Sequence, residues 1–229
     1  MGVRPQDPDS FDQVVDVYDR FSALTSGWVA DYLDRHLPAG GARAVDLGCG
    51  TGVHTELLAE RYEQVLGVDV SKPMLALARK NRHRPTVTYV RQDLRAVEPS
   101  LCGTFDLVFS AFVLHHVHPL EEGLRQARAL VRPGGHVLLI DVADDQQRSR
   151  AWFRMQALRA LGKDVRGRQR SVREAAELFR LSRHPAWLDH LVADTPLAPG
   201  EFRNSYAGVF QGADFTHLDR VVAMLWRRP

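Results

Sequence analysis

The sequence predicts an α/β fold built on a mostly parallel sheet of seven strands, with an antiparallel strand at the C-terminal end and a helical lid inserted after the fifth strand. Three observations predict this fold. Short apolar runs alternate with amphipathic helical patterns over residues 42–142, which is typical of strand–helix units in a parallel sheet. A glycine-rich turn follows the first apolar run. Residues 144–199 then have a helical pattern, before one more helix and a closing strand pair.

The first two strands are expected at ARAVDLG (42–48) and QVLGVD (64–69), with a helix at VHTELLAERY (53–62) between them. The next helix begins after Ser71, whose hydroxyl can cap it, and Pro73 suits its first turn. Its apolar positions are Met74, Leu75, Leu77 and Ala78. These elements form the first half of the expected sheet.

The second half follows the same alternation. VTYV (87–90) is the third strand, and FDLVFSAF (105–112) is the fourth, after a loop that holds Pro99 and Gly103. A helix from Leu120 to Val131 is expected to end at the Pro-Gly-Gly sequence of residues 133–135, and HVLLIDV (136–142) is the fifth strand. EFRNSYAGVF (201–210) predicts a helix and ADFTHLDRVVAMLWRR (213–228) an antiparallel pair.

The chain is expected to form a single domain, because 229 residues with 45% hydrophobic content fit one core and no linker interrupts them. We divide it into an N-terminal helical flap (1–41), a cofactor-binding core (42–142), a helical lid (143–199) and a C-terminal helix and strand pair (200–229).

Composition excludes several classes of protein. A net charge of +2 does not by itself predict binding to nucleic acid. No apolar run approaches the roughly 18 residues of a membrane span, and MGVRPQDPDS lacks the apolar core of a secretory signal, so a cytoplasmic protein is expected. The two cysteines, Cys49 and Cys102, are expected to be free thiols.

A glycine turn and two acids predict a nucleoside site. Gly48, Gly50 and Gly52 follow the first strand, where a parallel sheet binds ligands and a missing side chain lets backbone and ligand meet. Asp69 ends the second strand, and its two oxygens can accept from two adjacent ribose hydroxyls. The G-C-G-T-G spacing differs from the dinucleotide fingerprint, which argues against a nicotinamide-dependent oxidoreductase.

Five motifs extend this interpretation over residues 42–142: VDLGCGTG, GVDVS, VRQDLRAV, FDLVFSAFVLHHV and LVRPGGHVLLID. Together they resemble the class I S-adenosylmethionine-dependent methyltransferases, and specifically the type 11 branch that acts on small molecules. The resemblance implies a Rossmann-like sheet, S-adenosyl-L-methionine as the cofactor and methyl transfer to a small-molecule acceptor.

The resemblance also implies roles for individual residues. Asp46 and the loop of Gly48, Gly50 and Gly52 would hold the methionine end of the cofactor, Asp69 the ribose and Asp93 the adenine amino group. Met74 would pack on the adenine ring or serve only the core. The expected cofactor-binding set is completed by Leu94, Ser110 and Tyr18, and either Tyr18 or Arg20 of the flap could reach the methionine carboxylate.

Chemistry at the acceptor requires little beyond alignment and removal of a proton. His115 and His116 follow the fourth strand, so either imidazole could be the base, with His116 preferred, or the pair could only shape the pocket. No metal is expected, because the acids at 141, 144 and 145 match no ligand spacing.

Several alternatives stay open. A non-methylating reaction such as cyclisation would use the same cofactor motifs, and a non-catalytic interaction protein is a further alternative. The methylated atom could be oxygen, nitrogen or carbon. Strand four ends in Ser-Ala-Phe, which lacks the polar clamp for a flipped nucleobase. A small-molecule acceptor, no nucleic acid and no membrane are therefore the expected partners, and the oligomeric state is open.

The lid is rich in arginine, and its charges have two interpretations. They could form a solvated outer face above an apolar underside. Alternatively, Arg148, Arg150 or Arg154 could pair with a carboxylate or phosphate on the acceptor.

Overall fold

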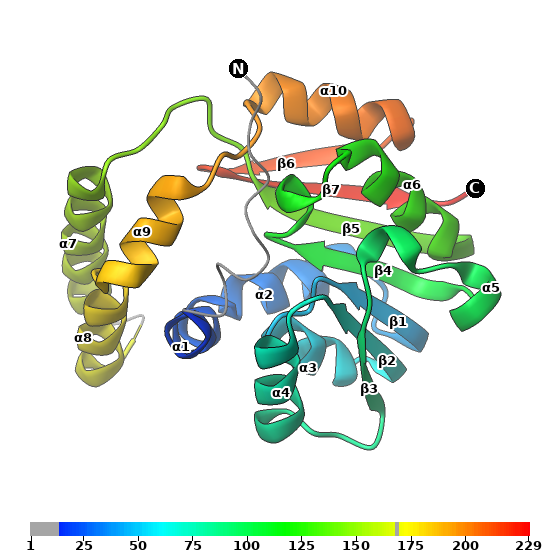
Figure 1. Ribbon diagram of the computed structural model, residues 1–229, viewed down its shortest axis with the longest axis horizontal. Helices are drawn as coiled ribbons and strands as arrows, with labels where there is room; N and C mark the ends of the chain where they lie inside the picture. Colours follow the sequence, from blue (N-terminus) through cyan, green and yellow to red (C-terminus); the bar gives the residue numbers. More distant parts are fainter. Residues whose placement is uncertain (1–13, 168–169) are drawn as a thin grey trace.

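One sheet of seven strands organises the molecule, in the order β3-β2-β1-β4-β5-β7-β6 (Figure 1). The computed structural model describes residues 14–167 and 170–229, so residues 1–13 of the predicted flap and 168–169 of the predicted lid lie outside the described residues. The strands are β1 (Gly41–Leu47), β2 (Tyr62–Asp69), β3 (Val87–Arg91), β4 (Phe105–Ala111), β5 (Val131–Val142), β6 (Asp214–Leu218) and β7 (Val221–Arg227). Strands β1 to β5 are parallel, and β7 pairs antiparallel with both β5 and β6. The predicted α/β fold is confirmed.

Ten α-helices and two 3₁₀ turns connect the strands within the described residues. They are α1 (Val15–Thr25), α2 (Gly27–His36), α3 (Val53–Ala59), α4 (Lys72–Asn81), α5 (Pro99–Cys102), α6 (Leu120–Leu130), α7 (Arg150–Gly167), α8 (Val172–Leu181), α9 (Pro185–Ala193) and α10 (Pro199–Val209), with the turns η2 (Leu94–Ala96) and η3 (Leu114–His116). The predicted cap of α4 is present, because Ser71 Oγ accepts from the amide of Met74 at 3.2 Å. No helix among the described residues has the length and apolar character needed to cross a membrane.

Two expected element boundaries were wrong. The helix predicted to reach Tyr62 ends at Ala59, because Tyr62 is buried and begins β2. Strand β5 begins at Val131, so the Pro-Gly-Gly sequence lies inside the strand rather than before it. The β4–β5 register shifts between Phe105 and Leu107, and this irregularity accommodates the left-handed φ of 74° at Gly134.

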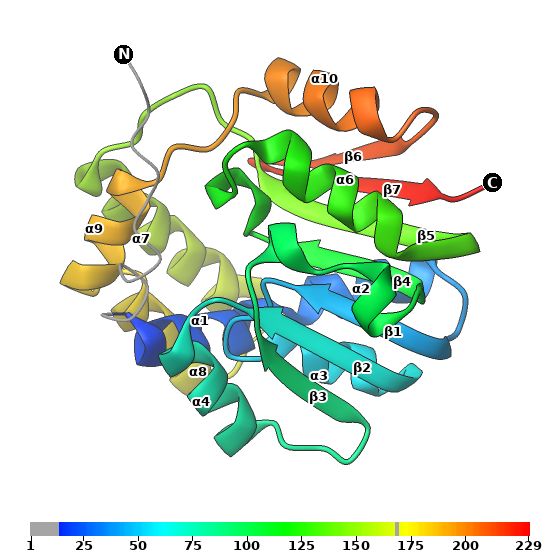
Figure 2. The ribbon, with the colours of Figure 1, turned by 45° about the vertical axis from the view of Figure 1, so that its right-hand side comes forward.

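Alternate residues of each central strand supply two apolar layers (Figure 2). On β5, Leu138 and Ile140 face α2 and α3, whereas Val137 and Leu139 face α6 and α10. All four side chains are at most 1% exposed. Burying each stabilises the fold by about 1.5–3 kcal/mol, so the centre of the sheet is rigid on both faces. That rigidity fixes the loops at the strand ends.

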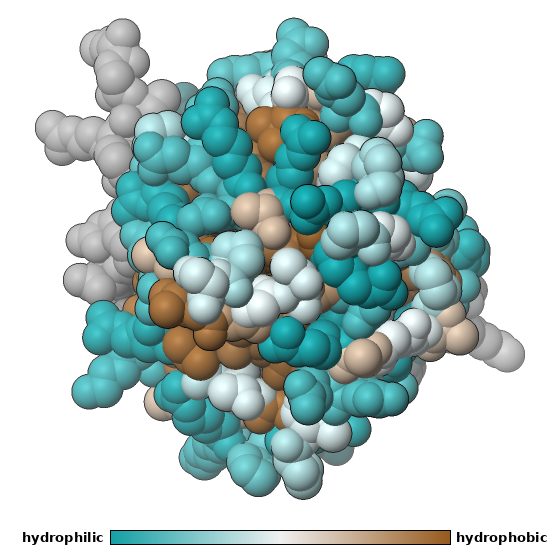
Figure 3. Space-filling view, turned by 90° about the vertical axis from the view of Figure 1, so that its right-hand side faces the viewer, coloured by the Kyte–Doolittle hydropathy of each residue, from teal (hydrophilic) through white to brown (hydrophobic). Residues whose placement is uncertain are grey.

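The helices α7, α8 and α9 lie in the segment predicted to be a lid and stand beside α1, at the carboxyl ends of the parallel strands (Figure 1). The chain leaves and re-enters the sheet at neighbouring points, because Ala143 bridges Leu197 and the amide of Asp144 donates to the carbonyl of Leu197 at 3.0 Å. The opposite side of the molecule is mainly hydrophilic, with apolar side chains in small areas (Figure 3). The helices α7 to α9 thus stand at the edge of the sheet where the parallel strands end.

Candidate active site

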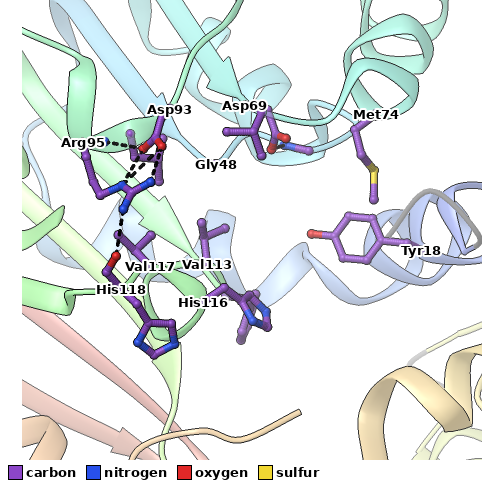
Figure 4. A pocket seen from close by; sticks show the side chains of 14 residues that line it. Tyr18, Gly48, Asp69, Met74, Asp93, Arg95, Val113, His116, Val117 and His118 are labelled. Carbon is purple, nitrogen blue, oxygen red and sulfur yellow. Dashed lines mark hydrogen bonds and ion pairs between the residues drawn. The ribbon is translucent and has the colours of Figure 1, made fainter. Parts of the chain in front are cut away.

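A cavity of about 380 Å³ lies at the carboxyl ends of β1, β2 and β4 (Figure 4). Eight of the residues predicted from the sequence line it: Tyr18, Gly48, Gly50, Asp69, Met74, Asp93, Leu94 and His116. They come from five separate stretches of the chain, which the sheet brings to one edge. Sequence reasoning missed further lining residues, namely Val70, Arg95, Phe112, Val113, Val117 and His118.

The glycine loop after β1 forms one wall of this cavity. The amides of Gly48 and Cys49 both donate to the carbonyl of Val68, at 2.8 and 2.9 Å, and so tie the loop to β2. Gly48 has a φ of 75°, and a Cβ there would lie 2.4 Å from a methyl group of Val113. Only glycine fits this position, since any side chain would require both a strained backbone and a displaced Val113.

Asp69 is held in place by the loops on either side of it. Its Oδ2 accepts from the amide of Gly50 and its Oδ1 from the amide of Ser71, each at 2.8 Å. A carboxylate oxygen can accept more than one hydrogen bond, and Asp69 lines the cavity. The geometry suits a pair of adjacent hydroxyl donors.

Three predicted cofactor residues do not line the cavity: Asp46, Gly52 and Ser110. Asp46 is 1% exposed and accepts from the hydroxyl of Thr55 at 2.6 Å. Burial, together with the charge of Asp69, raises the pKa of Asp46 to about 7. Ser110 donates to the carbonyl of Leu47 at 2.7 Å, and Gly52 precedes α3 as its N-cap. All three lie around the base of the glycine loop, and their contact with a cofactor stays a prediction.

Asp93 lies at another end of the cavity and is paired with Arg95. The guanidinium of Arg95 contacts Asp93 Oδ2 at 2.6 Å and donates to the carbonyl of His118 at 2.8 Å (Figure 4). Hydrogen bonds from Arg95 lower the pKa of Asp93, so this carboxylate stays ionised at neutral pH. Its neighbour Leu94 supplies an apolar surface to the same end.

The flap contributes Tyr18 but not Arg20. Tyr18 is directed into the cavity from α1, and burial raises the pKa of its phenol to about 12. Arg20 instead makes two hydrogen bonds of 3.0 Å to Glu177 of α8. Of the two candidates for the methionine carboxylate, only Tyr18 faces the cavity.

The histidine pair of η3 divides between two environments. His116 lines the cavity, and burial together with the charge of His115 lowers the pKa of its imidazole to about 3. His115 lies behind it, with Nδ1 at 2.5 Å from Asp141 Oδ1 and Nε2 at 3.1 Å from Asp194 Oδ1. Burial lowers the pKa of His115, but the two carboxylates outweigh burial and raise it to about 10. His116 is thus the neutral ring at pH 7 and the one that faces the cavity.

Two of the three lid arginines singled out from the sequence, Arg148 and Arg150, pair with carboxylates of the protein itself. Arg148 and Arg220 both contact Asp144 Oδ2, at 2.9 and 2.6 Å, and both lie over the ring of Trp152. Arg150 pairs with Asp189 of α9, and Arg154 is exposed. Arg148 borders a second cavity of about 260 Å³ between the lid and the end of β5. Its predicted contact with an anionic acceptor stays a prediction.

Part of the chain is similar to known methyltransferases. Residues 45–139 match the family model described as a methyltransferase domain. The ubiquinone biosynthesis O-methyltransferase of Chromobacterium violaceum is 36% identical over 112 residues, which cover 47% of each chain. The cypemycin N-terminal methyltransferase of a Streptomyces species is 35% identical over 153 residues, which cover 63% of this chain and 61% of that protein. The chain thus spans less than two thirds of either relative.

Solved structures share the fold at lower identity. A DhpI-SAM-HEP complex superposes with a TM-score of 0.61 at 18% identity and covers 95% of this chain and 93% of that one. Magnesium protoporphyrin IX methyltransferase from Synechocystis PCC 6803 with bound SAH has a TM-score of 0.61 at 16% identity, over 97% of this chain and 98% of that one. At these identities the likeness concerns the fold.

Proposed function

We propose that the chain is a class I S-adenosylmethionine-dependent methyltransferase, on the basis of the methyltransferase-domain match over residues 45–139, and that it transfers the methyl group to the oxygen or nitrogen of a small-molecule acceptor. One observation carries this proposal. Asp69, Asp93 and the glycine loop converge on a single cavity together with Tyr18 and His116. The two carboxylates can accept hydrogen bonds from a ribose and an adenine amino group. The imidazole of His116 lies in the same cavity and can face the molecule to be methylated.

The cofactor would lie across the cavity between Asp69 and Asp93. Asp69 would accept from the ribose hydroxyls, Asp93 from the adenine amino group, and the glycine loop with Tyr18 would adjoin the methionine end. Met74 and Leu94 would contact the adenine ring, and both border the cavity. Asp46, Gly52 and Ser110 would position the loop from beneath it.

The methyl group would then be directed toward His116. In the transfer, the acceptor atom forms a bond to the methyl carbon as the carbon–sulfur bond breaks, and the sulfonium becomes a neutral thioether. The acceptor proton passes to the neutral ring of His116 or to water. Alignment of two bound reactants accounts for about 7–11 kcal/mol of the barrier, so the protein's main contribution is the geometry of the cavity.

The acceptor would enter between η3 and the lid, where Phe112, Val113 and Val117 give the cavity an apolar wall. The relatives named above indicate two acceptor types to test, a hydroxyl of a ubiquinone precursor and the amino terminus of a peptide.

The experiment that tests the function has two stages. Calorimetric titration with S-adenosylmethionine should show binding by the purified protein, and acceptors of both types should then be screened for stoichiometric S-adenosylhomocysteine. Absence of cofactor binding would reject the proposal. Cofactor binding with turnover that yields no S-adenosylhomocysteine would point to a non-methylating reaction.

A further inference from the structure

Three side chains meet where the lid touches the sheet: His115 and His116 of η3, and Asp194 just after α9. One nitrogen of each ring and one oxygen of Asp194 all lie within 4.8 Å of one another. The closest pair is His115 Nε2 and Asp194 Oδ1, at 3.1 Å. Two imidazoles and one carboxylate, from elements far apart in the sequence, thus share one small volume.

Asp141 orients the His115 ring for this arrangement. Asp141 Oδ1 lies 2.5 Å from His115 Nδ1, and Asp141 Oδ2 accepts from the backbone amide of His115 at 3.0 Å. A carboxylate on Nδ1 holds a proton there and leaves Nε2 facing Asp194. Proteins use this carboxylate–histidine pair to orient and strengthen a metal ligand.

Two buried carboxylates flank His115 and favour a positive charge between them. The Asp141 and Asp194 side chains are only 2% and 14% exposed, and they flank one ring. Buried carboxylates are costly unless a positive charge compensates them. A ring proton can supply it, because His115 Nε2 and Asp194 Oδ1 are buried and lie 3.1 Å apart. A dication bound by both atoms would supply the same compensation in place of that proton.

The ligand types select the ion. Two imidazoles and a carboxylate suit Zn²⁺ or a similar transition-metal dication, whereas Mg²⁺ and Ca²⁺ prefer oxygen. Ligand bonds of about 2.0–2.2 Å at a tetrahedral centre separate the ligand atoms by about 3.3–3.6 Å. The 3.1 Å pair is close to this separation, and the ligand nitrogen of His116 lies within 4.8 Å of both atoms.

We propose that His115, His116 and Asp194 bind a divalent transition-metal ion of the Zn²⁺ type, with a fourth position open to the cavity that His116 lines. Resting on the proposed function, the further consequence is that a hydroxyl oxygen of the acceptor occupies this position and loses its proton to water. That oxygen then bonds to the methyl carbon as the carbon–sulfur bond breaks. Coordination lowers the pKa of bound oxygen groups, so an ion would replace His116 as the source of activation.

Metal binding can be measured without any acceptor. The full chain is treated with EDTA, dialysed and titrated with Zn²⁺ by calorimetry, and crystals of the loaded protein are examined by anomalous scattering at the zinc edge. The wild type is expected to bind one Zn²⁺ per chain at this position. Asp194→Asn and His116→Gln should each weaken binding at least about tenfold, and Asp141→Asn by about 10–100-fold, as for other residues that support a ligand.

His118→Gln is the matched control, because His118 lines the same cavity but lies outside the three-ligand set. Its Zn²⁺ affinity should equal that of the wild type. Circular dichroism spectra and melting temperatures confirm that each variant is folded. The inference is overturned if the wild type binds no Zn²⁺, or if the Asp194 and His116 variants bind it undiminished. Titration of the metal-free protein with S-adenosylmethionine separates the two proposals. If the protein binds S-adenosylmethionine but not Zn²⁺, only the metal site is rejected. If it binds Zn²⁺ but not S-adenosylmethionine, only the methyl transfer is rejected.

Discussion

Replacing Asp69 by alanine should weaken S-adenosylmethionine binding by about 2–4 kcal/mol, or about 30- to 1000-fold in Kd. The proposed ribose contact uses two hydroxyl donors on a charged acceptor, and each such hydrogen bond contributes about 1.5–3 kcal/mol. Both oxygens already accept from backbone amides, at 2.8 Å each, so each ribose hydrogen bond is expected to contribute less than the upper limit of this range. The same two bonds mean that the variant also loses stability.

Losing an acceptor for the amides of Gly50 and Ser71 should lower the free energy of unfolding by about 1–3 kcal/mol. Urea denaturation measures this loss, and calorimetric titration below the melting temperature measures the affinity. Asp106→Ala is the matched control, because Asp106 Oδ2 accepts from the amide of Arg43 at 2.7 Å at the opposite ends of the strands. The control should lose stability but keep cofactor affinity. A folded Asp69→Ala protein with wild-type affinity would remove Asp69 from the cofactor site.

Three further predictions concern the loop, the base of the lid and the acceptor side. Gly48→Ala should lower the free energy of unfolding by more than the ~1–2 kcal/mol that a left-handed backbone costs an alanine, because the added Cβ would also clash with Val113. Adding Val113→Ala removes the clash and should recover part of the melting temperature. No recovery would contradict the steric cause. Burial raises the pKa of Asp144, but hydrogen bonds from Arg148 and others outweigh it and lower the pKa to about 2. Its stabilisation is therefore present above the unfolded pKa of about 4 and lost as the pH falls toward 2, so urea denaturation of wild type and Asp144→Asn should differ at pH 7 and converge at pH 2. His116→Gln should lower turnover on a hydroxyl acceptor at least about 10²-fold with cofactor affinity unchanged, and steady-state kinetics with unchanged turnover would make the ring structural.

The sheet and most of the cavity could be predicted because both depend on local patterns. Strands β1 to β4 end within a residue or so of the expected positions, and the loops after them carry glycine and acidic residues that mark a ligand site. Parallel strands bring these ends together, so the sequence alone places Asp69 and Asp93 at one edge of the sheet, and both line the cavity. The histidine pair could be placed by the same rule.

Contacts between the lid, the flap and the sheet could not be predicted. Asp194 meets His115, and Glu177 meets Arg20, across long stretches of chain. Each contact depends on how helices pack, and neither residue stands in a pattern that indicates a partner. The orientation of side chains at a strand end is equally non-local, since Asp46 and Ser110 turn beneath the glycine loop rather than into the cavity.

The bridge between Ala143 and Leu197 has a consequence for how such a protein can diversify. The segment between them starts and finishes at adjacent points, held by the 3.0 Å bond from the Asp144 amide to Leu197. The entropic cost of closing a loop rises only slowly with its length. A longer, shorter or unrelated segment could therefore be inserted between these two residues without moving β5 or α10. If this segment selects the acceptor, as the sequence predicts, exchanging it between homologues would change the acceptor and leave the proposed cofactor site unchanged.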